Sequence, residues 1–80
     1  MAPELQKYYE DYMDLFVTEG WKAFQEDLKA ASESIDILSL EDAKQLHIAQ
    51  GKLDVFLRLQ NWETAIRNAH DDLLRSEEEE

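Results

Sequence analysis

Two histidines and nineteen carboxylates are the side chains of this 80-residue sequence that could bind a metal or transfer a proton. A metal site on helices needs ligands one turn apart, as in the Glu-x-x-His motif of di-iron bundles. His47 and His70 lie roughly six helical turns apart, and neither follows a carboxylate by three residues. We therefore expect both to be surface residues, and we expect no metal and no cofactor.

The carboxylates gather in short groups, such as Glu10, Asp11 and Asp14, or Glu26 and Asp27. Such groups can form an acid–base pair or an array that imitates DNA phosphates. Acid–base catalysis requires a cleft that perturbs a pKa, and a small helical chain has little concavity. Phosphate-binding loops, calcium loops and hydrolase motifs are also absent from the sequence. We expect a solvated acidic face, no catalytic residue and no enzyme.

Length and composition indicate one small, soluble domain. The chain is 44% hydrophobic, which is too apolar for a disordered protein, and its two glycines and one proline leave few turns. The net charge of −11 opposes direct binding to nucleic acid. No apolar run is long enough to span a membrane. The absence of cysteine fits a reducing compartment, so we expect an intracellular protein without membrane contact.

The pattern of apolar residues predicts two long helices. The first covers about residues 3–34 and begins at Pro3, whose missing N–H suits a first-turn position. Its apolar spacing slips by one residue beside Thr18 and Gly20, so this helix is either bent or broken near Gly20. The second covers about residues 40–75 and carries no proline.

The connection at about residues 35–39 ends in a helix start signal. In "LSLED" we expect Ser39 to cap the second helix, Asp42 to occupy its third position, and Leu38 to pack on Ala43. The four glutamates of residues 77–80 repel one another, so we predict a disordered acidic tail after a single domain of residues 1–76.

The second helix is apolar over about half its circumference, because two series of apolar residues interleave on it. The broader series contains Ile48, Gly51, Val55, Leu59, Trp62, Ile66, Ala69 and Leu73. A two-helix hairpin covers one seam, so the surplus must meet either the N-terminal segment or another chain. We predict an all-α fold, an antiparallel hairpin of two long helices (three if broken near Gly20) that packs as a dimeric helical bundle.

Folding the hairpin about residue 37 places Gly51 opposite Trp21 and Phe24, and Gly20 opposite the region of Asp54. Each glycine would then leave room for a facing aromatic side chain. We therefore predict a helix-packing role for Gly20, Trp21, Phe24 and Gly51, with a tolerated surface glycine as the alternative.

Aromatic residues crowd the first turns of the chain and occupy more of the helix than one neighbour covers. For Trp21, Phe24 and Trp62 the hairpin's own core is the favoured role; for Tyr8, Tyr9 and Tyr12 core and interface are equally plausible. Our interaction candidates are Tyr8, Tyr9, Tyr12, Phe16, Val55, Leu59, Trp62 and Ile66.

The segments "LFVTEGWKAFQEDLKAASESID" and "EDAKQLHIAQGKLDVFLRLQNWETAIRNAHDDL" resemble a group of small uncharacterised helical proteins of tailed bacteriophages, particularly podophages. The matching positions are Phe16, Glu19, Gly20, Trp21, Phe24, Gln50, Gly51, Leu53, Asn61, Trp62 and Glu63. The resemblance implies a viral protein of the host cytoplasm or the virion, with a place among morphogenesis proteins. It supplies no activity and no catalytic residue.

Two functions therefore remain open. The first is a non-enzymatic phage accessory protein, a helical protein–protein interaction module of virion structure or assembly that forms a homodimer or binds a phage or host protein. The second is an acidic inhibitor of a host nucleic-acid enzyme, whose carboxylates imitate DNA phosphates.

Overall fold

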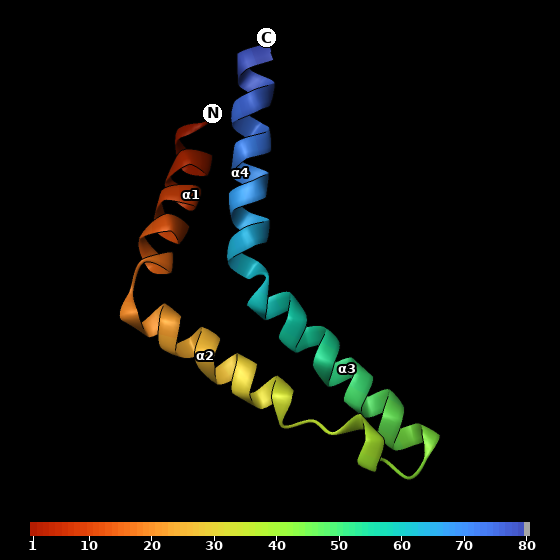
Figure 1. Ribbon diagram of the computed structural model, residues 1–80. Helices are drawn as coiled ribbons and strands as arrows, with labels where there is room; N and C mark the ends of the chain where they lie inside the picture. Colours follow the sequence, from red (N-terminus) through yellow and green to blue (C-terminus); the bar gives the residue numbers. More distant parts are fainter. Residues whose placement is uncertain (80) are drawn as a thin grey trace.

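The computed structural model describes residues 1–79, and within them the chain is entirely helical, with no β-strand (Figure 1). The prediction of an all-α protein is confirmed. The helices are α1 (Pro3–Phe16), α2 (Glu19–Glu33), α3 (Ala43–Gln60) and α4 (Trp62–Glu79), with a 3-10 helix η1 (Ile37–Ser39) between α2 and α3.

Each of the two expected long helices is divided in two. The first break follows Phe16, because Thr18 caps α2: its Oγ1 accepts a hydrogen bond from the Trp21 N–H (3.1 Å) and donates one to the Leu15 carbonyl (2.7 Å). A break near Gly20 was one of the two expected alternatives. The second break, at Asn61, was not predicted; a single residue there leaves the helical conformation, with φ −91° and ψ 4°.

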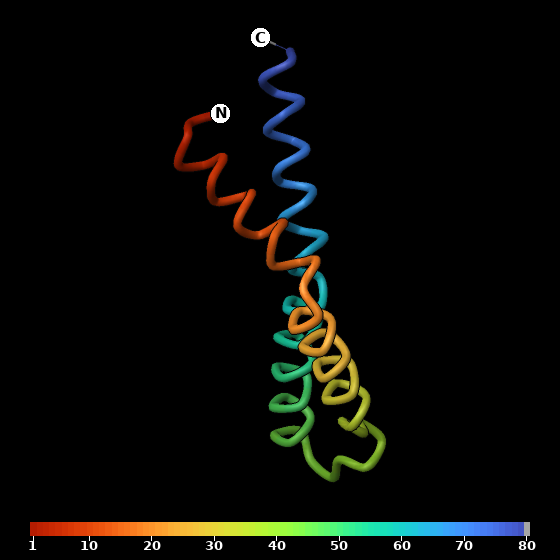
Figure 2. The backbone as a smooth tube through the Cα atoms, turned by 90° about the vertical axis from the view of Figure 1, so that its left-hand side faces the viewer, coloured from red at the N-terminus to blue at the C-terminus, as the bar shows by residue number. Residues whose placement is uncertain are grey.

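The two breaks lie at the same level of the molecule, which therefore has two arms joined at an elbow (Figure 1). We call them the α1/α4 arm (residues 1–17 and 61–79) and the α2/α3 arm (residues 18–60). In each arm the two helices lie side by side and run in opposite directions, and the N-terminal end of α1 leans away from α4 (Figure 2). The radius of gyration is 17.3 Å, whereas a compact 80-residue domain has about 12 Å.

The larger hydrophobic cluster holds the α1/α4 arm together. Tyr9, Phe16 and Ile66 are buried in it. Partly buried residues surround these three: Met1, Tyr12, Met13, Trp21 and Leu73. In the α2/α3 arm only Leu28 and Ala49 are buried. The small Ala49 side chain lets α2 and α3 approach closely, whereas aromatic rings separate α1 from α4.

The start of α3 differs from the prediction. Asp42, not Ser39, is the N-cap, because its carboxylate accepts a hydrogen bond from the Gln45 N–H (2.7 Å). Ser39 belongs to η1, a turn that the Asp36 carboxylate stabilises by accepting from the Leu38 N–H (3.0 Å). This turn directs Leu38 outward, where it is 96% exposed and packs on nothing.

The acidic C-terminus also differs from the prediction. Helix α4 continues through Glu79, so residues 77–79 are helical, while Glu80 lies outside the described residues. Glutamate is a good helix former. The α-ammonium group of Met1 pairs with Glu77, which ties the two ends of the chain together.

The predicted packing role of the glycines is wrong. Gly20 and Gly51 are both exposed, and a Cβ atom added at either would meet nothing within 4 Å. The reason is the length of the connection between α2 and α3. Residues 34–42 run beside the first half of α3, so Phe24 lies near Leu59 and Trp62 instead of Gly51.

Candidate protein-interaction surface

Of the residues with catalytic potential, His70 and Glu10 line one hollow between α1 and α4, together with Glu77. His47 is exposed on α3, whereas His70 is half-buried and stacks on the Tyr9 ring at 4.8 Å between centroids. Among residues 1–79, no group of three histidine, aspartate or glutamate side chains is placed to hold a metal ion. Over the same range, no helix is both long and apolar enough to cross a membrane.

Several carboxylates pair with basic residues on their own helix. Asp11 accepts a hydrogen bond from Lys7 (2.6 Å), and Asp54 pairs with Arg58 (3.1 Å). The hydrogen bond and charge of Asp11 raise the pKa of Lys7 above its ordinary value. These pairs are exposed surface contacts, which contribute little to stability.

A largely apolar hollow lies at the elbow. A groove of about 260 Å³ opens there, which we call the elbow groove. It is lined by Tyr12, Leu15, Trp21, Phe24, Leu59 and Trp62. The rings are close to one another: Trp21 and Phe24 are 5.8 Å apart and Tyr12 and Trp62 are 6.4 Å apart between centroids. Residues from both arms thus form one concave apolar surface.

A hydrogen-bond network fixes the geometry of the elbow. The Trp21 indole donates to Glu63 (3.0 Å), and Glu63 also accepts from Arg67 (2.9 Å). The Arg67 guanidinium lies over the Phe16 ring at 5.5 Å. On the other side of the bend, the Gln25 amide donates to the Leu59 carbonyl (3.2 Å). These contacts connect α2 to α3 and α4, so the elbow groove has a defined shape.

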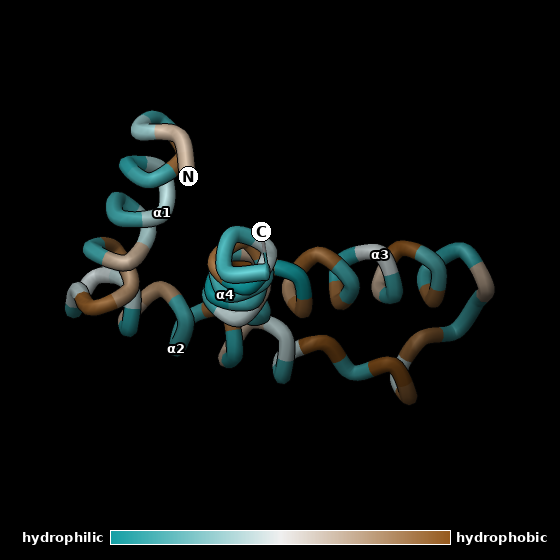
Figure 3. The backbone as a smooth tube through the Cα atoms, turned by 90° about the horizontal axis from the view of Figure 1, so that it is seen from above, coloured by the Kyte–Doolittle hydropathy of each residue, from teal (hydrophilic) through white to brown (hydrophobic). Residues whose placement is uncertain are grey.

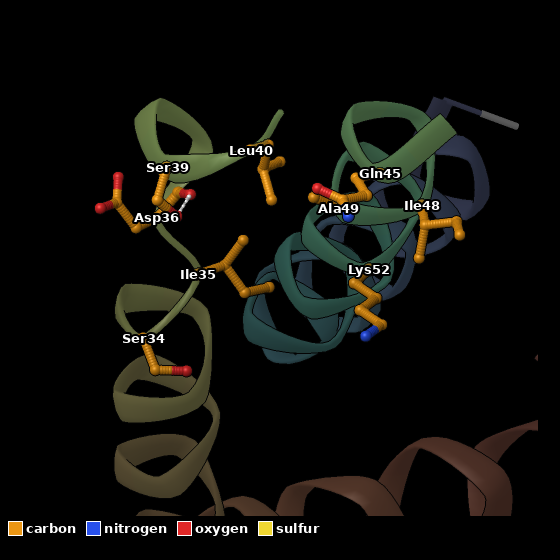
Figure 4. Close-up of a pocket in the computed structure, with 9 residues that line it drawn as sticks. All are labelled: Ser34, Ile35, Asp36, Ser39, Leu40, Gln45, Ile48, Ala49 and Lys52. Carbon is orange, nitrogen blue, oxygen red and sulfur yellow. Dashed lines mark hydrogen bonds between the residues drawn. The ribbon is translucent and has the colours of Figure 1, made fainter. Parts of the chain in front are cut away.

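A second hollow lies at the far end of the α2/α3 arm, where the connection meets α3 (Figure 4). Its volume is about 340 Å³. Ile35 and Leu40 of the connection contribute its apolar wall together with Ile48 and Ala49 of α3, and Lys52 lies at its edge. We call it the tip pocket.

An apolar face joins the tip pocket to the elbow groove. Ile48 and Val55 stand seven residues apart, which places them on one side of α3, and Trp62 follows at the start of α4, just after the break at Asn61. On α2, Phe24 borders the same groove as Trp62. We call this surface the open face, defined as Phe24, Ile48, Val55, Leu59 and Trp62. Colouring by hydropathy shows apolar segments recurring along α2 and α3 (Figure 3).

No other helix covers the open face within residues 1–79. The helices α1 and α4 reach the α2/α3 arm at the elbow and then turn away from it (Figure 1). Ile48, Val55, Phe24 and Trp62 remain 40% to 53% exposed. A helix pair normally buries its apolar side against a second layer, and this pair has none from its own chain.

The structure divides the predicted interaction residues into two groups. Tyr9, Phe16 and Ile66 are buried within the chain, so their prediction as interaction residues is wrong: α1 folds back on α4 and covers them. Val55, Leu59 and Trp62 belong to the open face, and Tyr12 lines the elbow groove.

Tyr8 stands apart from the open face, on the outside of α1. It is 45% exposed, and its ring meets those of Tyr9 and Tyr12 edge-on at 5.1 Å. Partial desolvation, together with the two neighbouring tyrosines, raises the pKa of the Tyr8 hydroxyl.

Sequence reasoning missed Leu15 and Ile48 as candidate site residues. Leu15 falls outside the apolar series of the first helix, and only the break at Thr18 brings it to the groove. Ile48 was detectable, because it stands seven residues before Val55, as Val55 does before Trp62.

No protein family matches the chain, and no curated protein or solved structure is significantly similar to it. The resemblance to phage proteins and the functional interpretation therefore stay predictions.

Proposed function

We propose that this chain is a non-enzymatic helical interaction module, a bent antiparallel hairpin that self-associates through its open face as a dimeric helical bundle. The resemblance to small phage proteins suggests a phage accessory protein that acts in virion structure or assembly, in the host cytoplasm or in the virion itself.

One observation carries this proposal: a strongly charged chain leaves the large apolar side chains of one face 40% to 53% exposed. The open face extends from the tip pocket to the elbow groove, and it includes two aromatic residues, Phe24 and Trp62, of the kind that anchor protein interfaces. Large exposed apolar patches on soluble domains are typical of interaction sites. The surface-paired carboxylates fit a solvated exterior better than a catalytic cleft.

Sedimentation equilibrium over a range of protein concentrations tests the proposal. We expect a dimer for the wild type and for Leu74→Asp, and a monomer for Val55→Asp. Leu74 is the control, because it is an exposed aliphatic residue (40%, against 53% for Val55) that lies on α4, outside the open face. A monomeric wild type, or equal behaviour of the two variants, would contradict self-association through this face.

A second candidate function is an acidic inhibitor of a nucleic-acid enzyme. Residues 77–79 are helical, so their carboxylates lie in ordered positions along the end of α4, after Asp71 and Asp72. The two functions respond oppositely to salt. Salt screens repulsion between acidic copies and strengthens a dimer, whereas it weakens binding to a basic groove. Titrating the dimer and a basic nuclease complex with salt separates them.

A further inference from the structure

The bend between α3 and α4 has no cause in the residues that form it. A sharp helix kink normally occurs at a proline, at glycine or serine pairs, or where a side chain enters the hydrogen-bond ladder. Residues 58–64 contain no proline, glycine or serine. The Asn61 N–H still donates to the Leu57 carbonyl (3.0 Å), and the Asn61 carbonyl accepts from the Ala65 N–H (2.9 Å). The cause of the bend therefore lies outside α3 and α4.

The side chain of Gln25, on α2, enters the ladder just before the break. Its amide donates a hydrogen bond to the Leu59 carbonyl (3.2 Å). In an unbroken helix this carbonyl accepts from the N–H four residues later, which belongs to Glu63. A side chain that takes the carbonyl opens the helix on the side that faces α2. That side is the outer side of the bend, as Figure 1 shows.

The inner side of the bend faces away from α2. A hollow of about 440 Å³ lies there, lined by Asp54, Leu57, Arg58, Asn61, Trp62 and Ala65. All of these residues come from α3, α4 and the break between them, so within residues 1–79 no other element presses on this side. On the outer side, the Trp21 indole donates to the Glu63 carboxylate in the first turn of α4 (3.0 Å). The contacts that hold the bend therefore come from α2.

We propose that α3 and α4 are one helix that Gln25 bends, and that the elbow is a hinge between the bent form and a straight hairpin. The sequence fits a straight helix, because the apolar series of residues 48–73 continues through Asn61 at intervals of three and four residues. The break at Thr18 lies at the same level as the break at Asn61 (Figure 1). Both sides of the hairpin can therefore pivot together.

The hinge controls the elbow groove. Tyr12 of α1 and Trp62 of α4 line this groove together with Phe24 of α2 and Leu59 of α3. Because its walls come from both arms, the groove keeps its shape only while the arms stay bent. A partner that fills the groove therefore stabilises the bent form. This inference goes beyond the proposed function, because the hinge operates in a monomer as well as in a dimer.

A distance measured across the break tests the hinge. The chain has no native cysteine, so Lys44→Cys and Ser76→Cys together place one nitroxide label on exposed α3 and one on exposed α4. Double electron–electron resonance gives the distance between the labels, and an excess of unlabelled protein removes distances between copies. In a straight helix the two Cα atoms lie about 48 Å apart. We expect a clearly shorter main distance for the otherwise unchanged chain.

Gln25→Met keeps the length of the side chain and removes its donor. We expect the ratio of distances near 48 Å to shorter ones to rise about fivefold, as for one lost hydrogen bond, and the main distance to lie near 48 Å when Trp21→Phe is added.

Gln60→Met is the matched control. It removes another hydrogen bond between α3 and α2, from the Gln60 amide to the Ser32 hydroxyl (3.4 Å), without freeing a backbone carbonyl, so its distances should not change. An equal shift in Gln60→Met, no shift in Gln25→Met, or a main distance near 48 Å in the unchanged chain would overturn the hinge. If the double variant loses helix content by circular dichroism, Gln25→Met alone decides. None of these outcomes depends on whether the chain forms a dimer.

Discussion

Each arm of the molecule is a pair of amphipathic helices, but the two arms differ in how much of their apolar surface they bury. In the α1/α4 arm, the rings of Tyr9 and Phe16 reach across to Ile66 and cover it. In the α2/α3 arm, Leu28 and Ala49 are the buried pair, and the neighbouring apolar residues of α3 remain exposed. One arm is closed by its own chain and the other is open.

The size of the covering side chains explains the difference. Helix α1 presents aromatic rings that each cover a large apolar area. After Leu28, α2 reads Lys-Ala-Ala-Ser-Glu, and its only apolar side chains there are two alanines. The large apolar residues of α3, which include Leu46, Ile48, Leu53, Val55 and Phe56, surround more of the helix than those of α4 do, so α3 needs a cover that α2 cannot supply. A helix with a broad apolar side is expected to have more apolar surface than one neighbour covers. The size of the side chains on that neighbour decides where this surface stays exposed.

Shortening one apolar side chain in each arm should give the largest difference in the free energy of unfolding, and so it tests this comparison first. Ile66→Ala removes a buried side chain from the closed arm, and we expect the free energy of unfolding to fall by about 3 kcal/mol. Val55→Ala, measured at concentrations where the chain is monomeric, should change it by less than about 0.5 kcal/mol. Urea denaturation followed by circular dichroism measures both. Equal losses would mean that the arms do not differ as described.

A smaller effect is expected at the elbow, where the arms meet. Trp21→Phe removes the indole N–H that donates to Glu63 while it keeps an aromatic ring in the cluster. We expect a loss of about 1 kcal/mol, typical of one hydrogen bond to a charged group that is only half-buried. Phe24→Leu, which keeps an apolar side chain and touches no hydrogen bond, is the control. A loss no larger than that of the control would mean that this bond does not stabilise the elbow.

Much of the fold was predictable from local patterns. Period and composition predict helices on both sides of a connection near residue 37, and Thr18 with Gly20 marks the first break. The break at Asn61 left no such signal, since the apolar series continues through it from Leu59 to Trp62. The cap of α3 was misplaced because Ser39 and Asp42 both suit an N-cap, and only the Asp36 turn decides between them.

The register between the helices was not predictable, and the candidate surface depends on it. Counting back from a tight turn at residue 37 places Gly51 opposite Trp21 and Phe24. The longer connection of residues 34–42 shifts α2 toward the second half of α3, which brings Phe24 to Trp62. Without that shift Phe24 would not lie beside Leu59 and Trp62, and the elbow groove would not form. Sequence spacing therefore identifies Val55, Leu59 and Trp62 but not the surface that they form.

Gly51 gives a further test of that register. Because a Cβ atom there meets nothing within 4 Å, Gly51→Ala should raise the free energy of unfolding by about 0.8 kcal/mol, the helix propensity difference between the two residues. Urea denaturation of the monomeric chain measures it. Gly20→Ala, in the first turn of α2, should gain less. If Gly51→Ala were instead destabilised, the added methyl group would meet a facing side chain, as the sequence predicted for this glycine.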